Sequence, residues 1–345
     1  MSEPPWAPET RDVVVVGGSA GGVTAVKRLV AGLPEDFGAA LFVTIHRGSG
    51  LPSVLADILS AAGPLPAVMA KEGEPFARGR IYVAPPDHHL IVGCDHVHVR
   101  RGPRENRTRP AIDPMFRSAA VSCSTRVIGV LLSGLLNDGT SGLIAIRRCG
   151  GLAVAQDPRD ALFGDMPRGA IEQGAVDEVA PLAHLSDALV RLTRQRRPPP
   201  VEIPGMLRAE AFIAAQELHM DPDNNPIGTL SPLTCPECHG AMYEIREGKL
   251  LRYRCHTGHA YTAEALRNEQ AEGWEDALYN ALRVQEEQLA LTRRMAEVAR
   301  EYGAGLSAEA FEERARGYAE GAEIVRHLIA AGQVGNAAAA ELADG

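Results

Sequence analysis

The feature that most constrains this chain is a set of short apolar runs that recur among helix-like segments in its first 194 residues. The runs are rich in β-branched residues and apolar nearly throughout; they comprise VVVV at 13–16, LFVTI at 41–45, RVIGVLL at 126–132 and GLAVA at 151–155. Strands that are buried on both faces of a parallel sheet have this pattern. Because these runs alternate with helical patterns, we predict a doubly wound α/β fold with a mostly parallel sheet.

Two segments interrupt this rhythm. In residues 81–100, apolar and polar positions alternate around a turn, so we expect an antiparallel hairpin there. The second segment, RQRRPPPVEIPG at 194–205, contains three consecutive prolines, which can neither continue a helix nor enter the interior of a sheet. We therefore place a domain boundary within it.

The 345 residues are enough for about two domains at ~150 residues each. Beyond the prolines we expect a short helix near 207–218, then a segment rich in Cys and His, then two helices with apolar residues at helical spacing. The predicted organisation is a disordered N-terminus at 1–11, an α/β domain at 12–194, a linker with a short helix at 195–232, a small metal-binding module at 233–268, a helical hairpin at 269–333 and a disordered tail at 334–345.

The charge and the hydropathy of the chain disfavour several functional classes. Lys and Arg number 35 against 44 Asp and Glu, a net charge of −9, which disfavours nucleic-acid binding because phosphate contacts need a basic surface. No stretch approaches the ~20 apolar residues that span a bilayer, and the first residues lack the pattern of a signal peptide. We expect a cytoplasmic protein without membrane insertion.

A glycine-rich loop, GGSAGG at 17–22, joins the first predicted strand to a helix. It does not fit a dinucleotide fingerprint, because Ser19 stands where the second glycine is required, and it lacks the GK[ST] of a phosphate-binding Walker loop. Residues 17–21 do fit G-x-S-x-G, in which a serine on a sharp strand-to-helix turn exposes its hydroxyl. The helix N-terminus offers backbone N–H groups for an oxyanion. The alternative is a serine that only caps the helix.

A serine nucleophile needs a base and an acid that orients the base. His46 ends the second predicted strand and Asp138 follows the strand at 126–132, so both are expected at the same sheet edge as Ser19. Taken singly, His46 fits a structural histidine and Asp138 a turn or N-cap; their common placement favours a triad. The order Ser, His, Asp differs from that of the α/β-hydrolases and indicates another fold family.

The Cys/His segment has the spacing of a structural zinc site. Cys235, Cys238, Cys255 and His259 form C-x2-C-x16-C-x3-H, with His239 and His256 as alternatives for the fourth ligand. Such a module is too small to fold on apolar burial alone, so the metal would supply folding energy. A lost metal site or a redox pair is the alternative. The module and the helices would serve targeting or regulation, with a regulatory partner of their own.

From Val13 to Leu192 the chain resembles the catalytic domain of the CheB-type chemotaxis protein-glutamate methylesterases. The resemblance rests on blocks in family order: VVVVGGSAGG, IHRGSG, YVAPPDHHLIV, RENRTRPAIDPMFRSAA, LLSGLLNDGTSGL and AQDPRDALFGDMPRGAIEQGAVDEVAPL. It implies Ser19 as nucleophile, His46 as general base and acid, and Asp138 as the residue that orients His46. Ala20 and Leu135 depart from the family, which usually has Thr and Met at these places. Since the resemblance starts near residue 12, we expect no receiver domain in these residues.

The resemblance implies hydrolysis of glutamate γ-methyl esters on methylated receptors, without a cofactor for catalysis, and the family also deamidates glutamine. The alternatives are a serine esterase for another ester and a non-catalytic signalling scaffold. Arg104, Arg107 and Arg109 lie in a polar loop that could face an acidic receptor helix, although solvated surface charges are the simpler interpretation. We expect the acidity of the chain to lie away from Ser19.

Overall fold

The computed structural model describes residues 9–46, 54–216 and 227–343, with side chains as far as residue 331. It contains two compact units, Met1–Leu266 and Arg267–Gly345. The proline-rich segment 194–205 lies inside the first unit, because the chain that follows it packs back against the α/β domain.

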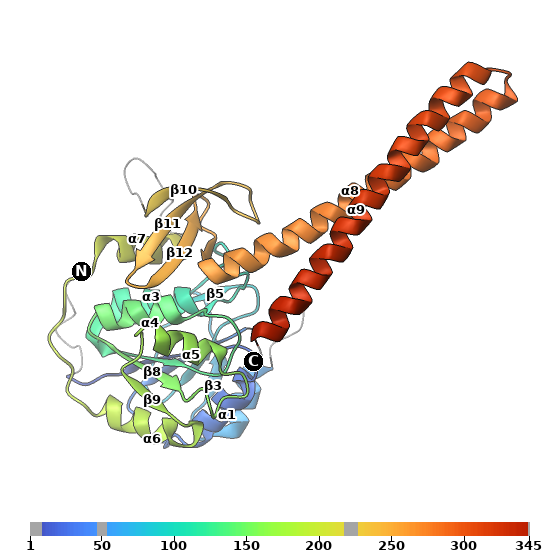
Figure 1. Ribbon diagram of the computed structural model, residues 1–345. Coiled ribbons are helices and arrows are strands. Elements are labelled where there is room, and N and C mark those ends of the chain that lie inside the picture. Colours follow the sequence, from blue (N-terminus) through green and yellow to red (C-terminus); the bar gives the residue numbers. More distant parts are fainter. Residues whose placement is uncertain (1–8, 47–53, 217–226, 344–345) are drawn as a thin grey trace. The chain divides into compact units, whose positions relative to one another are not determined.

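A seven-stranded sheet forms the centre of the first unit, in the order β3-β4-β2-β1-β7-β8-β9 (Figure 1). All of its strand pairings are parallel. The strands are β1 (Val13–Gly18), β2 (Ala40–Ile45), β3 (Ala67–Met69), β4 (Ile81–Val83), β7 (Val127–Leu131), β8 (Leu152–Gln156) and β9 (Glu178–Ala180). The four predicted runs are confirmed as β1, β2, β7 and β8. The three-residue strands were not anticipated, since so short a run carries no periodicity.

Helices cover both faces of this sheet (Figure 1). One face is covered by α3 (Ile112–Cys123), α4 (Thr140–Arg148) and α5 (Asp165–Glu172), and the other by α1 (Gly22–Ala31), α2 (Leu55–Ala62) and α6 (Leu182–Thr193). Alternate residues of β1 enter the two apolar clusters: Val13 and Val15 face one layer, and Val14 and Val16 face the other. The predicted doubly wound fold is therefore confirmed.

The antiparallel hairpin is present but shorter than the segment 81–100. It consists of β5 (His89–Val92) and β6 (Val97–Arg100). Residues Ile81–Val83 instead form β4 and pair in parallel with β2 and β3. All three β4 residues are buried, so they belong to the main core rather than to a half-exposed hairpin.

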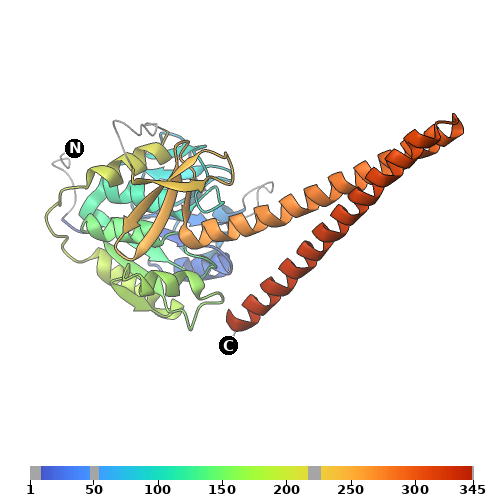
Figure 2. The same cartoon turned by 45° about the horizontal axis from the view of Figure 1, so that its top comes forward.

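The metal-binding module is a four-stranded antiparallel sheet in the order β10-β11-β12-β13. Its strands are β10 (Thr229–Thr234), β11 (Ala241–Glu247), β12 (Leu250–Cys255) and β13 (Ala260–Thr262). The sheet lies beside α7 (Gly205–Ala214), the short helix predicted near 207–218 (Figures 1 and 2). Ile213 of α7 packs with Ile227 and with Ile245 of β11 in one small apolar cluster. The module is thus joined to the α/β domain by packing as well as by the chain.

Two long helices, α8 (Ala263–Glu301) and α9 (Gly305–Ala343), form an antiparallel pair (Figure 2). The second unit contains α9 and the part of α8 from Arg267 onward. Arg326 of α9 lies 2.6 Å from Glu286 of α8. The structure continues α9 through residues 334–343, where a disordered tail was expected; alanine, which fills much of that segment, has the highest helix propensity. Residues 344–345 lie outside the described part.

At the start of the chain, only residues 9–11 of the segment 1–11 are described. Residues 1–8 lie outside the described part, as does 217–226 of the predicted linker. Thr10, however, forms an antiparallel bridge with Arg196, and Arg11 is buried. Among the helices of the described segments, none is long and apolar enough to cross a bilayer.

Candidate active site and metal centre

The three predicted catalytic residues lie at the carboxyl edge of the main sheet. Gly18, the last residue of β1, pairs with Ile45, the last residue of β2. Ser19 and His46 are the next residues along the chain, so they lie side by side at the ends of these two strands. The His46 N–H donates to the Gly18 carbonyl at 3.0 Å, which holds the two chain ends together. Asp138 comes after β7, the neighbour of β1 on its other side.

Ser19 occupies a sharp turn between β1 and α1. Its N–H donates to the Ser133 carbonyl at 2.9 Å, and its carbonyl accepts from the Gly22 N–H at 2.8 Å. Gly21 has a φ of 75°, and a Cβ there would lie 2.7 Å from the Ser133 hydroxyl oxygen, so this turn requires glycine. In the described part of the chain, the N–H groups of Ala20 and Gly21 have no hydrogen-bond partner. These two groups are available to an oxyanion.

A second glycine lets another segment approach Ser19. A Cβ on Gly134 would lie 3.0 Å from the Ser19 Cβ and 2.2 Å from the Met166 Cε. The Gly134 carbonyl accepts from the Met166 N–H at 3.0 Å, and its N–H donates to Phe163. The loop after β7 and the start of α5 therefore form one wall beside the serine.

His46 and Asp138 are directly hydrogen-bonded. The His46 Nε2 lies 2.7 Å from the Asp138 Oδ2, and the side chains are 13% and 3% exposed. Since Asp138 is ionised, Nε2 carries the proton, and Nδ1 is the ring nitrogen that can accept one. The Thr108 hydroxyl oxygen lies 3.2 Å from the same Nε2. This arrangement fixes the imidazole as an orienting acid does in a triad.

Asp138 is a buried carboxylate that receives several donors. The N–H of Ile112, at the start of α3, donates to Oδ2 at 2.7 Å, and the Asn106 Nδ2 donates to Oδ1 at 3.1 Å. Burial alone would raise the pKa of Asp138, but hydrogen bonds from His46, Ile112 and Asn106 and the charge of His46 lower it to about 2. Burial and the negative charge of Asp138 raise the pKa of the neighbouring Asp113 well above its usual range.

Asn106 and Thr108 were not singled out from the sequence. They lie in the loop 104–109, where the arginines attracted attention instead. The Arg109 guanidinium pairs with Asp87 at 2.7 Å, and Arg104 lies 3.9 Å from Glu237. Two of the three arginines that were candidates for a receptor-facing surface therefore have acidic partners in the protein itself.

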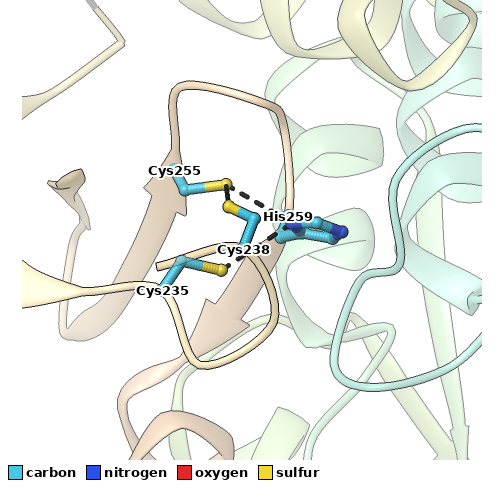
Figure 3. A group of neighbouring side chains, drawn as sticks. All are labelled: Cys235, Cys238, Cys255 and His259. Carbon is cyan, nitrogen blue, oxygen red and sulfur yellow. Dashed lines mark hydrogen bonds between the residues drawn. The ribbon is translucent and has the colours of Figure 1, made fainter. Parts of the chain in front are cut away.

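The four predicted metal ligands converge at one point (Figure 3). The ligand atoms of Cys235, Cys238, Cys255 and His259 all lie within 4.8 Å of one another. The His259 Nδ1 is 3.7 Å from the Cys235 sulfur and 3.6 Å from the Cys255 sulfur, and the Cys238 and Cys255 sulfurs are 3.6 Å apart. Ligands about 2.3 Å from a tetrahedral zinc would be about 3.7 Å apart. The donors and their spacing therefore fit Zn²⁺.

The surroundings of these ligands also fit a metal site. The second ring nitrogen of His259, Nε2, lies 3.3 Å from the Glu237 carboxylate, which is the outer partner that a metal-bound histidine usually has. His239 and His256, the alternatives for the fourth ligand, are outside the cluster. With three thiolates and one imidazole, the set leaves no open position, as in structural sites.

Part of this chain is similar to known proteins of one family. The CheB methylesterase family matches residues 14–189. The chain is 38% identical over 183 residues to "Protein-glutamate methylesterase/protein-glutamine glutaminase 2" of Anaeromyxobacter dehalogenans, covering 53% of this chain and 54% of the relative. It is 37% identical to a "Putative protein-glutamate methylesterase/protein-glutamine glutaminase" of Leptospira interrogans, covering 52% of this chain and 94% of the relative.

A solved structure agrees with these relatives. The crystal structure of the Thermotoga maritima CheB methylesterase catalytic domain is similar with a TM-score of 0.51 and 30% identity, over 53% of this chain and 99% of that one. This chain spans about half the length of the Anaeromyxobacter relative. The family match ends before α7, so the metal-binding module and the long helices lie outside it. From its parallel sheet, its sheet-edge residues and these matches, the chain belongs to the CheB methylesterase family.

Proposed function

We propose that this protein hydrolyses glutamate γ-methyl esters on methyl-accepting chemotaxis-type receptors, with Ser19, His46 and Asp138 as its catalytic triad. The observation that carries the proposal is the 2.7 Å hydrogen bond between His46 and the buried Asp138 at the sheet edge that also presents Ser19. The names of the Anaeromyxobacter and Leptospira relatives support the choice of ester.

The first half of the reaction forms an acyl-enzyme. The Ser19 Oγ attacks the ester carbonyl carbon while the His46 Nδ1 accepts the hydroxyl proton. The tetrahedral intermediate then expels methoxide, which takes that proton from His46 and leaves as methanol, so a glutamyl ester of Ser19 remains. Asp138 stays ionised throughout, as its lowered pKa allows, and stabilises the imidazolium.

The second half regenerates the serine. A water molecule loses a proton to His46 and attacks the acyl carbon, and the Ser19 oxygen leaves with that proton. The glutamic acid side chain so formed releases its remaining proton to solvent and becomes a carboxylate. In both halves the N–H groups of Ala20 and Gly21 are the candidate oxyanion donors. A glutamine amide at the same centre would release ammonia instead of methanol, and the names of the relatives include this glutaminase activity.

The metal centre has a structural part in this proposal. Cys235, Cys238, Cys255 and His259 would hold one Zn²⁺, whose binding stabilises a module with a very small apolar core. A cysteine thiol such as that of Cys149 persists best in a reducing compartment, which favours the cytoplasm. A regulatory partner for the C-terminal helices stays a prediction; Trp274, Tyr279 and Leu291 of α8 are exposed apolar side chains that such a partner would cover.

The test measures methanol released from a methylated receptor fragment by the full chain. We expect Ser19→Ala to reduce this rate by at least about 10³-fold, because the nucleophile is lost. Ser307→Ala, at an exposed position in α9, is the matched control and should keep the wild-type rate. Turnover of small esters without methanol release from the receptor fragment would contradict the proposed substrate.

A further inference from the structure

The loop 104–109 lies between the triad and the metal-binding module. On one side, the Asn106 Nδ2 donates to the Asp138 Oδ1 at 3.1 Å. On the other side, the Asn106 Oδ1 accepts from the Thr262 N–H of β13 at 2.9 Å, and the Asn106 N–H donates to the Ala260 carbonyl at 2.8 Å. The amide side chain of this buried residue thus contacts both regions, and its Nδ2 also donates to the Asp113 Oδ2 at 3.5 Å. These bonds fix which way the amide faces.

The metal ligands continue directly into this contact. Ala260 follows the ligand His259, whose carbonyl accepts from the N–H of another ligand, Cys255, at 2.9 Å. A short path of covalent and hydrogen bonds therefore leads from the metal centre through β13 to Asn106, then to Asp138 and His46. The ligand set determines where β13 lies, and β13 determines where Asn106 lies.

A buried ion pair holds the same loop one residue earlier. The Glu105 carboxylate accepts from the Arg254 Nη2 of β12 at 2.8 Å, and its other oxygen accepts from Arg117 of α3. All three side chains are at most 2% exposed. Burial alone would raise the pKa of Glu105, but the charges of Arg117 and Arg254 lower it. Glu105 therefore stays ionised between the two arginines.

The backbone of Asn106 also needs these contacts. Its φ of 48° lies in the left-handed region, which asparagine tolerates better than most residues but which still costs energy. The contacts with Ala260 and Thr262 offset that cost. Without β13 nothing in the described part of the chain would replace the acceptor and donor that hold Asn106 in this conformation.

We propose that Asn106 is a positioning residue for Asp138, and that the metal-loaded module holds Asn106 in place through β13, so that the triad is fully competent only with the metal bound. This inference rests on the proposed function for the identity of the triad, but not for the substrate. It gives the module, which lies outside the family match, a direct effect on the catalytic centre.

The first test measures how fast a serine-directed phosphonate labels Ser19, because labelling needs the triad but no receptor ester. We expect Asn106→Gly to slow labelling about tenfold, the effect of losing one hydrogen bond to a charged group. Glycine accepts the left-handed backbone, so the change removes the side chain without strain. Asn137→Ala is the matched control: Asn137 also bonds Thr262, at 2.7 Å, but its side chain is not bonded to Asp138, and we expect labelling within about twofold of wild type.

Asn106→Asp separates positioning from a merely structural role. The new carboxyl keeps an acceptor for Thr262, but it can donate to Asp138 only while protonated. Asp138, Asp113 and Glu105 are acidic groups near it, and His46, Arg117 and Arg254 are basic groups near it. We expect labelling to approach the wild-type rate at the acid side of its range and to fall as the pH rises. A rate equal to that of Asn106→Gly at every pH, or no slowing in Asn106→Gly, would overturn the proposal.

The second test compares the full chain loaded with Zn²⁺ and treated with a chelator. We expect hydrogen exchange at the Asn106 amide to become faster and Ser19 labelling to slow about tenfold without metal. Exchange and labelling that do not change on chelation would overturn the role of the module. If the wild type labels at Ser19 but releases no methanol from receptor fragments, the proposed substrate fails while this inference stands.

Discussion

The α/β domain and the metal-binding module are stabilised in different ways. The α/β domain has a parallel sheet between two large apolar clusters, so burial of apolar surface supplies most of its stability. The apolar cluster around the metal ligands contains only six buried residues, two of which are the ligands Cys235 and Cys255. Such a core cannot offset the entropy of ordering four strands. We therefore expect the module to depend on a bound metal and on its contact with the larger domain.

That contact contains buried charges in addition to the apolar cluster of α7 and β11. Arg252 and Arg254 of β12 donate to Glu210 of α7, and Arg254 also reaches Glu105. Burial alone would raise the pKa of Glu210, but the charges of the neighbouring arginines lower it by more. The pKa of Glu210 is therefore below its usual value. Buried ion pairs add little net stability compared with apolar packing, but they tolerate only one arrangement. This fits the proposal that the module holds Asn106 in one position beside Asp138.

The largest effect should follow loss of the metal. Because a structural Zn²⁺ can contribute about 10 kcal/mol to folding, Cys235→Ala should unfold the sheet β10–β13 while the α/β domain keeps its secondary structure. Metal analysis and hydrogen exchange would measure this. Cys149→Ala is the control: burial raises the pKa of Cys149 to about 11, and it is not among the clustered ligands, so zinc content should not change. A full complement of zinc in Cys235→Ala would contradict the ligand assignment.

An intermediate effect should follow loss of one buried charge at the contact. Arg254→Met leaves Glu105 and Glu210 short of a partner in a dry environment, and we expect the free energy of unfolding to fall by about 3–5 kcal/mol. Chemical denaturation would measure it. Arg246→Ala, on the exposed side of the same module and paired with Glu244, should cost less than about 1 kcal/mol. If both variants lost the same free energy of unfolding, the buried ion pairs of Arg254 would matter no more than an exposed ion pair.

The smallest effect concerns acid stability of the α/β domain. The folded pKa of Asp138 is about 2, below the unfolded value of about 3.9, so its stabilising effect is complete above pH 4 and is lost as the pH falls through 2. The difference in unfolding free energy between wild type and Asp138→Asn should shrink by about 2 kcal/mol from pH 5 to pH 2. Asp165→Asn, an exposed carboxyl paired with Arg168, should show no such change. A constant difference for Asp138→Asn would contradict the lowered pKa.

Much of the catalytic region could be predicted from the sequence because its signals are local. A buried parallel strand is a short apolar run, and the residue that follows it must lie at the carboxyl edge of the sheet. From this rule, the sequence alone predicted that Ser19, His46 and Asp138 lie at one edge of the sheet. The ligand spacing likewise anticipated the convergence of Cys235, Cys238, Cys255 and His259, although the choice of His259 over His239 and His256 needed the structure.

The remaining features depend on contacts between distant segments. Asn106 and Thr262 are 156 positions apart. Asn106 lies in the block RENRTRPAIDPMFRSAA, but nothing in the residue pattern gives it or Thr262 a role in a site. The position of α7 and β12 against α3 depends on pairing charges such as Arg254 and Glu105, and many surface ion pairs would look the same in the sequence. The proline-rich segment indicated a boundary because prolines that interrupt helices and strands can be recognised in a sequence. The packing of the following chain against the α/β domain cannot be recognised there.

The sequence by itself determined the class of the sheet, the edge where the triad lies and the ligands available to a metal, because these follow from periodicity and spacing along the chain. Only the tertiary structure decided that the metal-binding module packs on the catalytic domain and that Asn106 contacts both. The physical reason is that hydrogen bonds and ion pairs between remote segments form wherever the fold brings partners together, and a chain of residues does not record which partners meet.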